Sequence, residues 1–403
     1  MSPIIQSSNK LKTGLYVHIP FCIHKCAYCD FYSLPNLQLI PDYTNALIKE
    51  IQLKANQSLI DTIYFGGGTP SVLTVYEIEK IYHAIYHHFH IYEFPEITLE
   101  ANPGTLSNDN LSAWKNLGIN RINLGIQSFN DKHLHKLGRI YKADQAHDGI
   151  HLLLKNGFSN IGFDLIYGIP GQTINDFETD LLTAIQYHPK HLSCYSLTYE
   201  PGTPMYQQVK EKKMIPLSEK TVTKMMALLM EIMKDKGFDH YETSNFALCP
   251  EFRSKHNQKY WNNQTPYIGL GASAHSYTPY QRSWNVKDIG QYIHLLSLNK
   301  DPISGTEKLT REQQMIECIL LGLRTKQGIQ IDPFEKNFSV CFNEIFSETL
   351  TLLESDNYVD KTNDACRLTS TGWFYLDSIT DQMVNCLGTT GVALGCYLTP
   401  FQG

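Results

Sequence analysis

The 403-residue sequence predicts an α/β fold in which a mostly parallel sheet, open or curled into an incomplete barrel, precedes a smaller helical domain. Three observations lead to this class. Six short apolar segments alternate with segments of helical spacing, and glycine-rich or polar clusters follow the apolar segments. From about Glu307 the pattern changes to helices followed by very short strands.

The first strand is the alternating apolar segment 15–19, which ends at Pro20. Further strands are expected at 61–65, 96–100, 121–126, 160–166 and 191–197. Helices are expected between them at 42–57, 74–88, 107–117, 143–156 and 174–186, with Thr74 as a helix cap. Such alternation is typical of parallel strands joined by right-handed crossovers.

Three cysteines follow the first strand with the spacing C-x3-C-x2-C, at Cys22, Cys26 and Cys29. Three thiolates hold three irons of a [4Fe-4S] cube and leave the fourth iron open to an exogenous ligand. Two alternatives remain at this point: a zinc site with His24 as the fourth ligand, and three unrelated buried thiols.

Polar and glycine-rich residues follow the later strands, and parallel strands end at one common edge. The Gly66–Pro70 loop lets the backbone approach a ligand, and it lacks the lysine of a phosphate loop. Glu100, Gln127 and Asp164 end successive strands, and Arg139 could pair with a carboxylate. We expect these residues to surround a polar ligand, although each alone is more often a solvated residue at a strand end.

The second half of the chain begins with helical spacing at 204–238, strongest at 219–235, and continues with a loop-rich segment at 241–276. This segment contains His256 and Trp261 within the sequence HNQKYW. A neutral histidine can ligate haem iron and aromatic rings suit a porphyrin face, but most of the 16 histidines must be surface or packing residues.

Helices are expected at 309–323, 331–338 and 342–354, and short strands at 358–359 and 366–368. This order is winged-helix-like, and we interpret it as a docking or lid module. The predicted regions are 1–240 (core with the cluster and cofactor site), 241–306 (connecting segment), 307–382 (C-terminal domain) and 383–403 (an apolar, glycine-rich tail without an assigned role).

The composition is that of a soluble globular protein, with a net charge of -6 that gives no electrostatic footprint for nucleic acid. The N-terminus lacks the apolar region of a signal peptide, and no apolar run of membrane-spanning length is present. The ten cysteines are three clustered and seven scattered, which favours a reducing compartment. We therefore expect a cytoplasmic protein.

The motifs HIPFCIHKCAYCDF, GGGTPS, EANPGT, RINLGIQSF, LGRIY, FDLIYGIPGQT, YETSNFA and HNQKYW occur in this order. Over about residues 14–380 the chain thereby resembles the HemN/HemW branch of the radical SAM superfamily, and the HemW type most closely. The resemblance implies a partial (β/α)6 barrel with a C-terminal winged-helix-like domain.

The resemblance also implies that Cys22, Cys26 and Cys29 hold a [4Fe-4S] cluster whose open iron binds S-adenosylmethionine. The residues that would contact this cofactor are Tyr16, Gly67, Gly68, Thr69, Glu100, Gln127, Arg139 and Asp164, with Tyr28 packing against it. His256 would be the candidate haem ligand.

Two functions fit this branch. One is a haem chaperone of HemW type that passes haem to acceptors such as membrane-bound respiratory haem proteins, either as a monomer or as a homodimer, and with or without peripheral attachment to a membrane. The other is an oxygen-independent coproporphyrinogen III oxidase, which converts porphyrinogen propionates to vinyl groups by radical decarboxylation. The oxidases carry a fourth cysteine where this chain has Phe31, and a longer N-terminal segment. Both departures favour the chaperone. A structural zinc site in a non-catalytic protein is the third interpretation.

Overall fold

A computed structural model describes residues 12–388 and contains a main sheet of twelve strands in this range. The strands are β1 (Lys12–Ile19), β2 (Leu59–Gly67), β3 (His90–Ala101), β4 (Arg121–Gln127), β5 (Ile161–Tyr167), β6 (His191–Ser196), β7 (Asp239–Glu242), β8 (Asn245–Ala247), β9 (Tyr267–Leu270), β10 (His275–Thr278), β11 (Gln281–Asn285) and β12 (Ile303–Lys308). Their order in the sheet is β12-β11-β10-β9-β1-β2-β3-β4-β5-β6-β8-β7.

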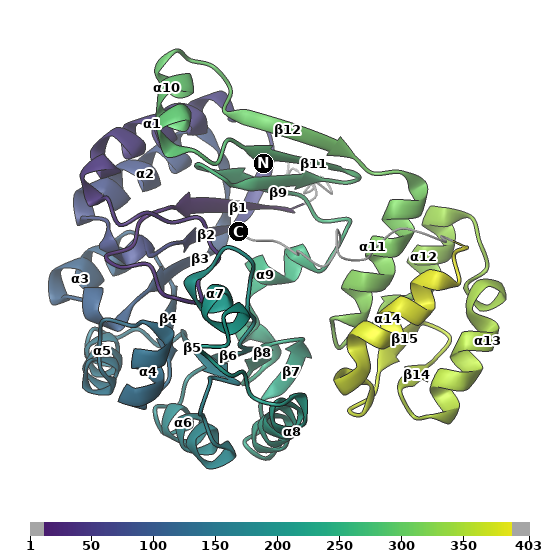
Figure 1. The fold of residues 1–403 in the computed structure, drawn as a ribbon. Helices are drawn as coiled ribbons and strands as arrows, with labels where there is room; N and C mark the ends of the chain where they lie inside the picture. The colour runs from purple at the N-terminus through teal and green to yellow at the C-terminus, as the bar shows by residue number, and fades with distance from the viewer. Residues whose placement is uncertain (1–11, 389–403) are drawn as a thin grey trace, which may run out of the picture.

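Strands β1 to β6 pair in sequence order, and every one of these pairs is parallel. Strand β9 adds a further parallel partner on the free side of β1. The remaining strands are antiparallel and extend the sheet at both ends. The α/β prediction is therefore confirmed, and Figure 1 shows that the sheet is curved but open.

The helices of the main body are α1 (Ile40–Leu53), α2 (Val75–His88), α3 (Asn108–Asn116), α4 (Asp131–Leu137), α5 (Ala143–Lys155), α6 (Ile174–Gln186), α7 (Pro204–Lys210), α8 (Glu219–Asp235), α9 (Lys255–Tyr260) and α10 (Ile289–Ser297). Most of them cover the outer side of the curved sheet, whereas α7 and α9 lie on its inner side (Figure 1). Helix α2 shows how local sequence determines these helices. Thr74 and Glu77 form a reciprocal capping box at its N-terminus. One face of the helix is buried through Ile78, Ile81 and Ile85.

Two parts of the main body were missed by the sequence prediction. Helix α4 is a short helix that ends at Gly138 in the left-handed conformation. The segment expected to be loop-rich contains β8, β9 and helix α9, and the chain continues through β10, β11, helix α10 and β12, none of which was predicted. Strand β9 has only four residues, and its partner β1 lies about 250 residues earlier in the chain, so local sequence pattern carries little signal for it.

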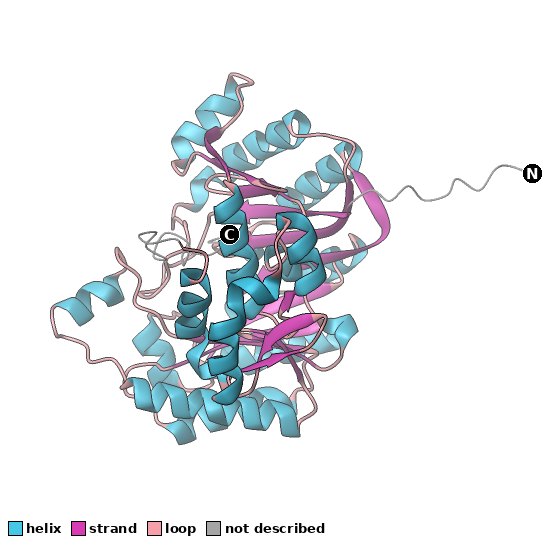
Figure 2. Ribbon diagram, turned by 90° about the vertical axis from the view of Figure 1, so that its right-hand side faces the viewer, coloured by secondary structure: helices cyan, strands magenta, loops and turns pink. Residues whose placement is uncertain are grey.

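The C-terminal helices are α11 (Arg311–Leu323), α12 (Ile331–Phe338), α13 (Phe342–Ser355) and α14 (Leu376–Asn385). They surround a second hydrophobic core, beside a three-stranded sheet of β13 (Ile329–Gln330), β15 (Ala365–Leu368) and β14 (Val359–Lys361). Figure 2 looks at the molecule from the side of these helices, with the main sheet behind them. The predicted helices and the two predicted strands are present, and β13 and α14 are additional.

The C-terminal helices are joined to the main body by backbone hydrogen bonds. The amide of Thr243 donates to the carbonyl of Arg324 at 3.0 Å, and the amide of Lys326 donates to the carbonyl of Tyr241 at 3.0 Å. Met226 and Met230 on α8 also pack against the second core. Most of the predicted tail, 389–403, lies outside the described residues.

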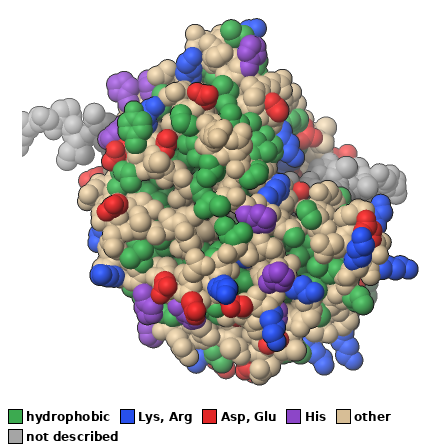
Figure 3. All heavy atoms as spheres, turned by 60° about the vertical axis from the view of Figure 1, so that its left-hand side comes forward, with side chains coloured by type: hydrophobic (Ala, Val, Ile, Leu, Met, Phe, Trp, Pro, Cys, Tyr) green, Lys and Arg blue, Asp and Glu red, His purple; other side chains and the backbone are tan. Residues whose placement is uncertain are grey.

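Within residues 12–388, no helix is both long enough and apolar enough to cross a membrane. On the face drawn in Figure 3, acidic, basic and histidine side chains are interspersed rather than gathered by sign. This face therefore carries no single-sign patch that would attract a polyanion.

A buried carboxylate fastens the added strands to the core. Glu50 on α1 is completely buried, and its oxygens accept hydrogen bonds from the Gly271 amide at 2.6 Å, Asn285 Nδ2 at 2.6 Å and the Tyr292 hydroxyl at 2.6 Å. Lys54 Nζ lies 2.8 Å from the same carboxylate. Glu50 thereby joins α1 to the segment after β9, to β11 and to α10.

We predict that Glu50→Ala lowers the free energy of unfolding by about 3 kcal/mol, because it leaves buried donors and the Lys54 charge without their acceptor. Urea denaturation followed by circular dichroism measures this loss. Gln52→Ala, at an exposed position of the same helix, is the matched control. Equal midpoints for both variants would contradict this role of Glu50.

Candidate functional site

The three-cysteine loop leaves the carboxyl end of β1 and is held on both of its sides. Leu34 N donates to the Pro20 carbonyl at 2.9 Å, and Cys22 N donates to the Leu34 carbonyl at 3.1 Å. Ala27 in the middle of the loop donates to the Leu137 carbonyl at 3.2 Å and accepts from the Met205 amide at 2.9 Å. The loop is therefore anchored to β1, to the end of α4 and to the start of α7.

The three thiols are free and lie close enough to influence one another. Burial raises the pKa of Cys26, and it raises the pKa of Cys29 to about 11, with further increases from the neighbouring thiols. Among residues 12–388, no three His, Cys, Asp or Glu side chains converge closely enough to hold a single metal ion. A four-iron cube needs a wider arrangement, because each thiolate binds a different iron.

The glycine loop after β2 lies directly against the three-cysteine loop. Gly68 N donates to the Ile19 carbonyl at 2.9 Å, and a Cβ at Gly68 would lie 2.7 Å from the Phe21 carbonyl oxygen and 3.0 Å from Cys22 Sγ. Gly67 has φ of +108°, and a Cβ there would lie 2.6 Å from the His18 ring. Both positions therefore require glycine for close approach.

A chain of side-chain hydrogen bonds crosses the rim from the cysteines to Arg139. Thr69 Oγ1 donates to Cys22 Sγ at 3.4 Å and accepts from Asn102 Nδ2 at 3.0 Å. Asn102 Oδ1 accepts from Arg139 Nη1 at 3.2 Å, and Arg139 Nη2 donates to the Tyr28 hydroxyl at 2.9 Å. We call these five residues the rim chain; they come from four successive loops.

Asn102 is the member of the rim chain that sequence reasoning did not select. The sequence identified the segment Ala101–Gly104 only as a breaker cluster after a strand. Its position at the carboxyl end of β3 was the available signal, because Glu100, which was selected, lies two residues earlier.

Arg139 is positioned by the left-handed Gly138 that ends α4. Gly138 has φ of +75°, and a Cβ there would lie 3.1 Å from the Ala27 amide nitrogen of the cysteine loop. The guanidinium also lies over the Tyr28 and Tyr141 rings, at 5.8 and 5.5 Å from their centroids. Its buried Nε has no hydrogen-bond partner within the protein. A positively charged group with a free donor thus lies beside the three thiols and suits an anionic ligand.

Two carboxyl groups lie on neighbouring parts of the rim. Burial raises the pKa of Glu100 to about 7, and its Oε1 accepts from the Tyr64 hydroxyl at 2.6 Å. Burial raises the pKa of Asp164 to about 6, opposed by a hydrogen bond from Ser193 and by the charge of Arg139. Once it has lost its proton, each carboxylate can accept a hydrogen bond from a cationic group or a hydroxyl.

Gln127 ends β4 in a left-handed conformation with φ of 68°, at an irregularity in the pairing with β5. A Cβ at Gly125 would lie 3.1 Å from Gln127 Nε2 and 3.2 Å from Asn102 Oδ1. The bulge therefore turns the Gln127 amide toward the rim chain.

Tyr16 lies deeper in the sheet, where its hydroxyl is 3.1 Å from His18 Nδ1. His18 Nε2 in turn is 3.0 Å from the Tyr32 carbonyl oxygen of the cysteine loop, and burial lowers the pKa of His18 to about 4. The neutral imidazole can accept from Tyr16 and donate to Tyr32, and it thereby links β1 to the loop. Sequence reasoning did not select His18.

His256 lies apart from the rim chain, in the interior between α9 and β2. The side chain is completely buried; Nδ1 is 2.8 Å from Thr62 Oγ1, and Nε2 is 2.9 Å from the Tyr260 hydroxyl. Its ring stacks on Tyr64 at 5.0 Å, and burial lowers its pKa to about 3. Both ring nitrogens are engaged, so iron ligation requires at least one of these bonds to break.

A cavity of about 110 Å³ opens at the rim, lined among others by His24, Cys26, Asn102, Arg139 and Tyr141. The fold therefore brings Gly68 and Thr69 against Cys22, and Asn102 links Thr69 to Arg139 and Tyr28. It also places Glu100 and Gln127 at the carboxyl ends of β3 and β4, whereas Asp164, expected at a strand end, lies in the middle of β5. The residues present fit a cluster held by thiolates with a polar organic ligand beside it.

Comparisons with known proteins agree with this geometry. Residues 16–184 match the Radical SAM superfamily model, and residues 309–375 match the HemN C-terminal domain model. Proteins named "Heme chaperone HemW" from Lactococcus lactis and Bacillus subtilis are 36% and 34% identical; the alignments each cover 89% of this chain, and 93% and 95% of those proteins. The coproporphyrinogen III oxidase HemN from Escherichia coli has a similar fold, with a TM-score of 0.81, 22% identity and coverage of 93% and 90%.

We predict that Gly68→Ala reduces the iron and sulfide retained after anaerobic reconstitution. The added Cβ must displace the Phe21 carbonyl or Cys22, and such overpacking costs about 1–3 kcal/mol. Gly104→Ala is the matched control, because its Cβ would meet nothing closer than 3.7 Å. Wild-type iron content in Gly68→Ala would show that the close contact does not shape the site.

Proposed function

Because the chain belongs to the HemW family of the radical SAM superfamily, we propose that it is a haem chaperone that binds haem and delivers it to acceptor haem proteins. It would also hold a [4Fe-4S] cluster that carries exchangeable S-adenosylmethionine. The observation that most supports the cluster and its cofactor is the rim chain, which joins the three-cysteine loop to polar groups on three further loops.

Cys22, Cys26 and Cys29 would hold the cluster, and a cluster with one open iron supplies a site for an amino-acid ligand and for one-electron chemistry. Thr69 would fix the orientation of Cys22. Arg139, with its free Nε, would attract the carboxylate of the cofactor. Glu100 and Asp164 would accept hydrogen bonds from its ammonium or ribose groups.

The oxidase interpretation is less well supported by the residues near the cluster. Phe31 is exposed at the position of the oxidases' fourth cysteine, and its carbonyl accepts a hydrogen bond from Lys25 Nζ at 3.1 Å. It offers no ligand and no acid or base to a substrate. The similarity to HemN at 22% identity concerns the fold.

We predict that the affinity for S-adenosylmethionine rises about tenfold between about pH 6 and about pH 8, because Glu100 must lose its proton to accept a bond from a cationic ligand. The sign follows from the raised pKa of about 7: below it the carboxyl is neutral and binding must expel the proton. Equilibrium dialysis with the reconstituted protein measures the affinity. Glu100→Gln should bind S-adenosylmethionine weakly at every pH. A wild-type pH profile in this variant would show that Glu100 does not cause the pH dependence.

We predict that the wild-type protein binds haem saturably at about one haem per chain. An anaerobic titration followed by the Soret band measures this, beside an assay for protoporphyrinogen formation with reductant and S-adenosylmethionine. Haem binding without turnover supports the chaperone, whereas turnover without saturable haem binding would contradict it. His256 stays a predicted ligand, and His256→Ala with the exposed His294→Ala as control tests it.

A further inference from the structure

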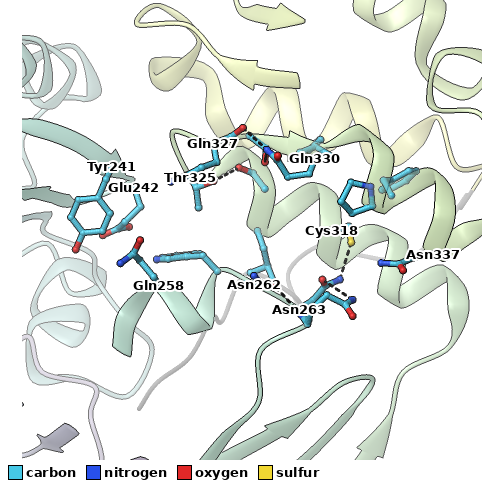
Figure 4. A pocket seen from close by; sticks show the side chains of 18 residues that line it. Tyr241, Glu242, Gln258, Asn262, Asn263, Cys318, Thr325, Gln327, Gln330 and Asn337 are labelled. Carbon is cyan, nitrogen blue, oxygen red and sulfur yellow. Dashed lines mark hydrogen bonds between the residues drawn. The ribbon is translucent and has the colours of Figure 1, made fainter. Parts of the chain in front are cut away.

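A second cavity lies away from the rim, between the main body and the C-terminal helices. It has a volume of about 500 Å³, and its lining includes Gln258, Trp261, Cys318, Ile329, Phe334 and Asn337. Figure 4 shows residues from α9 and the loop after it facing residues of α11 and α12. We call it the interdomain cavity.

The walls of the interdomain cavity are held in place from both sides. The backbone bonds between Thr243 and Arg324 and between Tyr241 and Lys326 close one end. At the other end Asn263 Nδ2 donates to Cys318 Sγ at 2.8 Å (Figure 4). An ion pair of Arg282 with Glu317 joins β11 to α11 nearby. The cavity is therefore preformed, which is usual for small-molecule sites at domain junctions.

The lining combines flat apolar walls with many amide groups. Trp261 is partly exposed and supplies aromatic surface, whereas Leu321, Ile329 and Phe334 are almost fully buried and form the apolar floor. Seven asparagine and glutamine side chains complete the lining: Gln258, Asn262, Asn263, Gln264, Gln327, Gln330 and Asn337. Such walls suit a large planar apolar ligand whose edge carries carboxylates, because amide N–H groups can donate to carboxylate oxygens.

The cavity also offers one soft ligand for iron. Among its lining residues, Cys318 is the only cysteine, and no histidine or methionine is present. The Tyr241 hydroxyl is already engaged, 2.7 Å from His191 Nε2 and 3.2 Å from the Ser254 amide. Burial raises the pKa of Cys318 to about 11, so the group is a thiol until a metal displaces its proton.

We propose that haem binds in the interdomain cavity, against Trp261, with Cys318 as a ligand to its iron. This inference rests on the proposed haem chaperone function. An iron–sulfur bond forms between Cys318 Sγ and ferric haem, and the thiol proton leaves to water, so no oxidant or reductant is needed. The volume lies within the range of about 300–1,000 Å³ for small-molecule sites.

Ligation by His256 and ligation by Cys318 would place haem at two different sites. His256 belongs to the same short helix as Gln258, but it faces Thr62 and Tyr64 in the interior and does not line the cavity. Variants of the two residues therefore separate the two sites.

The test is an anaerobic haem titration of the full chain, with Soret absorbance and electron paramagnetic resonance of the ferric complex. Asn337→Trp places an indole at an exposed position on the cavity wall, and we expect about tenfold weaker haem binding. Ser347→Trp, at an exposed position of α13 outside the lining, is its control. Cys318→Ser should change the ferric Soret maximum and the resonance signal, and the exposed Cys341→Ser should change neither.

The iron content of the reconstituted cluster serves as the check on folding for every variant. Wild-type affinity and spectra in both Asn337→Trp and Cys318→Ser would overturn the inference. Loss of haem binding in His256→Ala with normal cavity variants would also overturn it, while leaving the chaperone function intact. Absence of saturable binding in the wild type would overturn the chaperone function and the inference with it.

Discussion

The parallel pairing of β1 to β6 is the constraint on which the candidate site depends. Because these strands run the same way and neighbour one another in sequence order, their carboxyl ends share one edge. Residues more than a hundred positions apart, such as Tyr28 and Arg139, therefore come within hydrogen-bond distance. Buried apolar side chains fix the register, and a shift of one residue would turn Glu100 away from the rim.

Helix α9 lies between the rim of the sheet and the interdomain cavity. At its start His256 stacks on Tyr64, which donates a hydrogen bond to Glu100 at the rim. Just after its end Trp261 lines the interdomain cavity. A continuous set of contacts therefore runs from the proposed cofactor site to the proposed haem site. These contacts give the HNQKYW motif a structural role as the wall between the proposed cofactor site and the proposed haem site. This role does not require its histidine to ligate iron.

The parts of the fold that follow local rules could be predicted from the sequence. Thr74 and Glu77 form a capping box that predicts the start of α2, and apolar runs predict β1 to β6. The parts that depend on distant neighbours could not: β9 has four residues, and Asn102 gains its role only through Thr69 and Arg139. The full burial of His256 is likewise set by Thr62 and Tyr260, and an isolated motif cannot show it.

We propose that the three-cysteine loop holds a four-iron cluster with one iron open to S-adenosylmethionine. Mössbauer spectroscopy of protein reconstituted with isotopically enriched iron, recorded with and without S-adenosylmethionine, tests it most directly. We expect one iron of the cluster to become distinct when the cofactor is added, while the other three keep their thiolate environment. A spectrum without the signals of a four-iron cluster would contradict this proposal. So would a cluster whose iron signals do not change when S-adenosylmethionine is added.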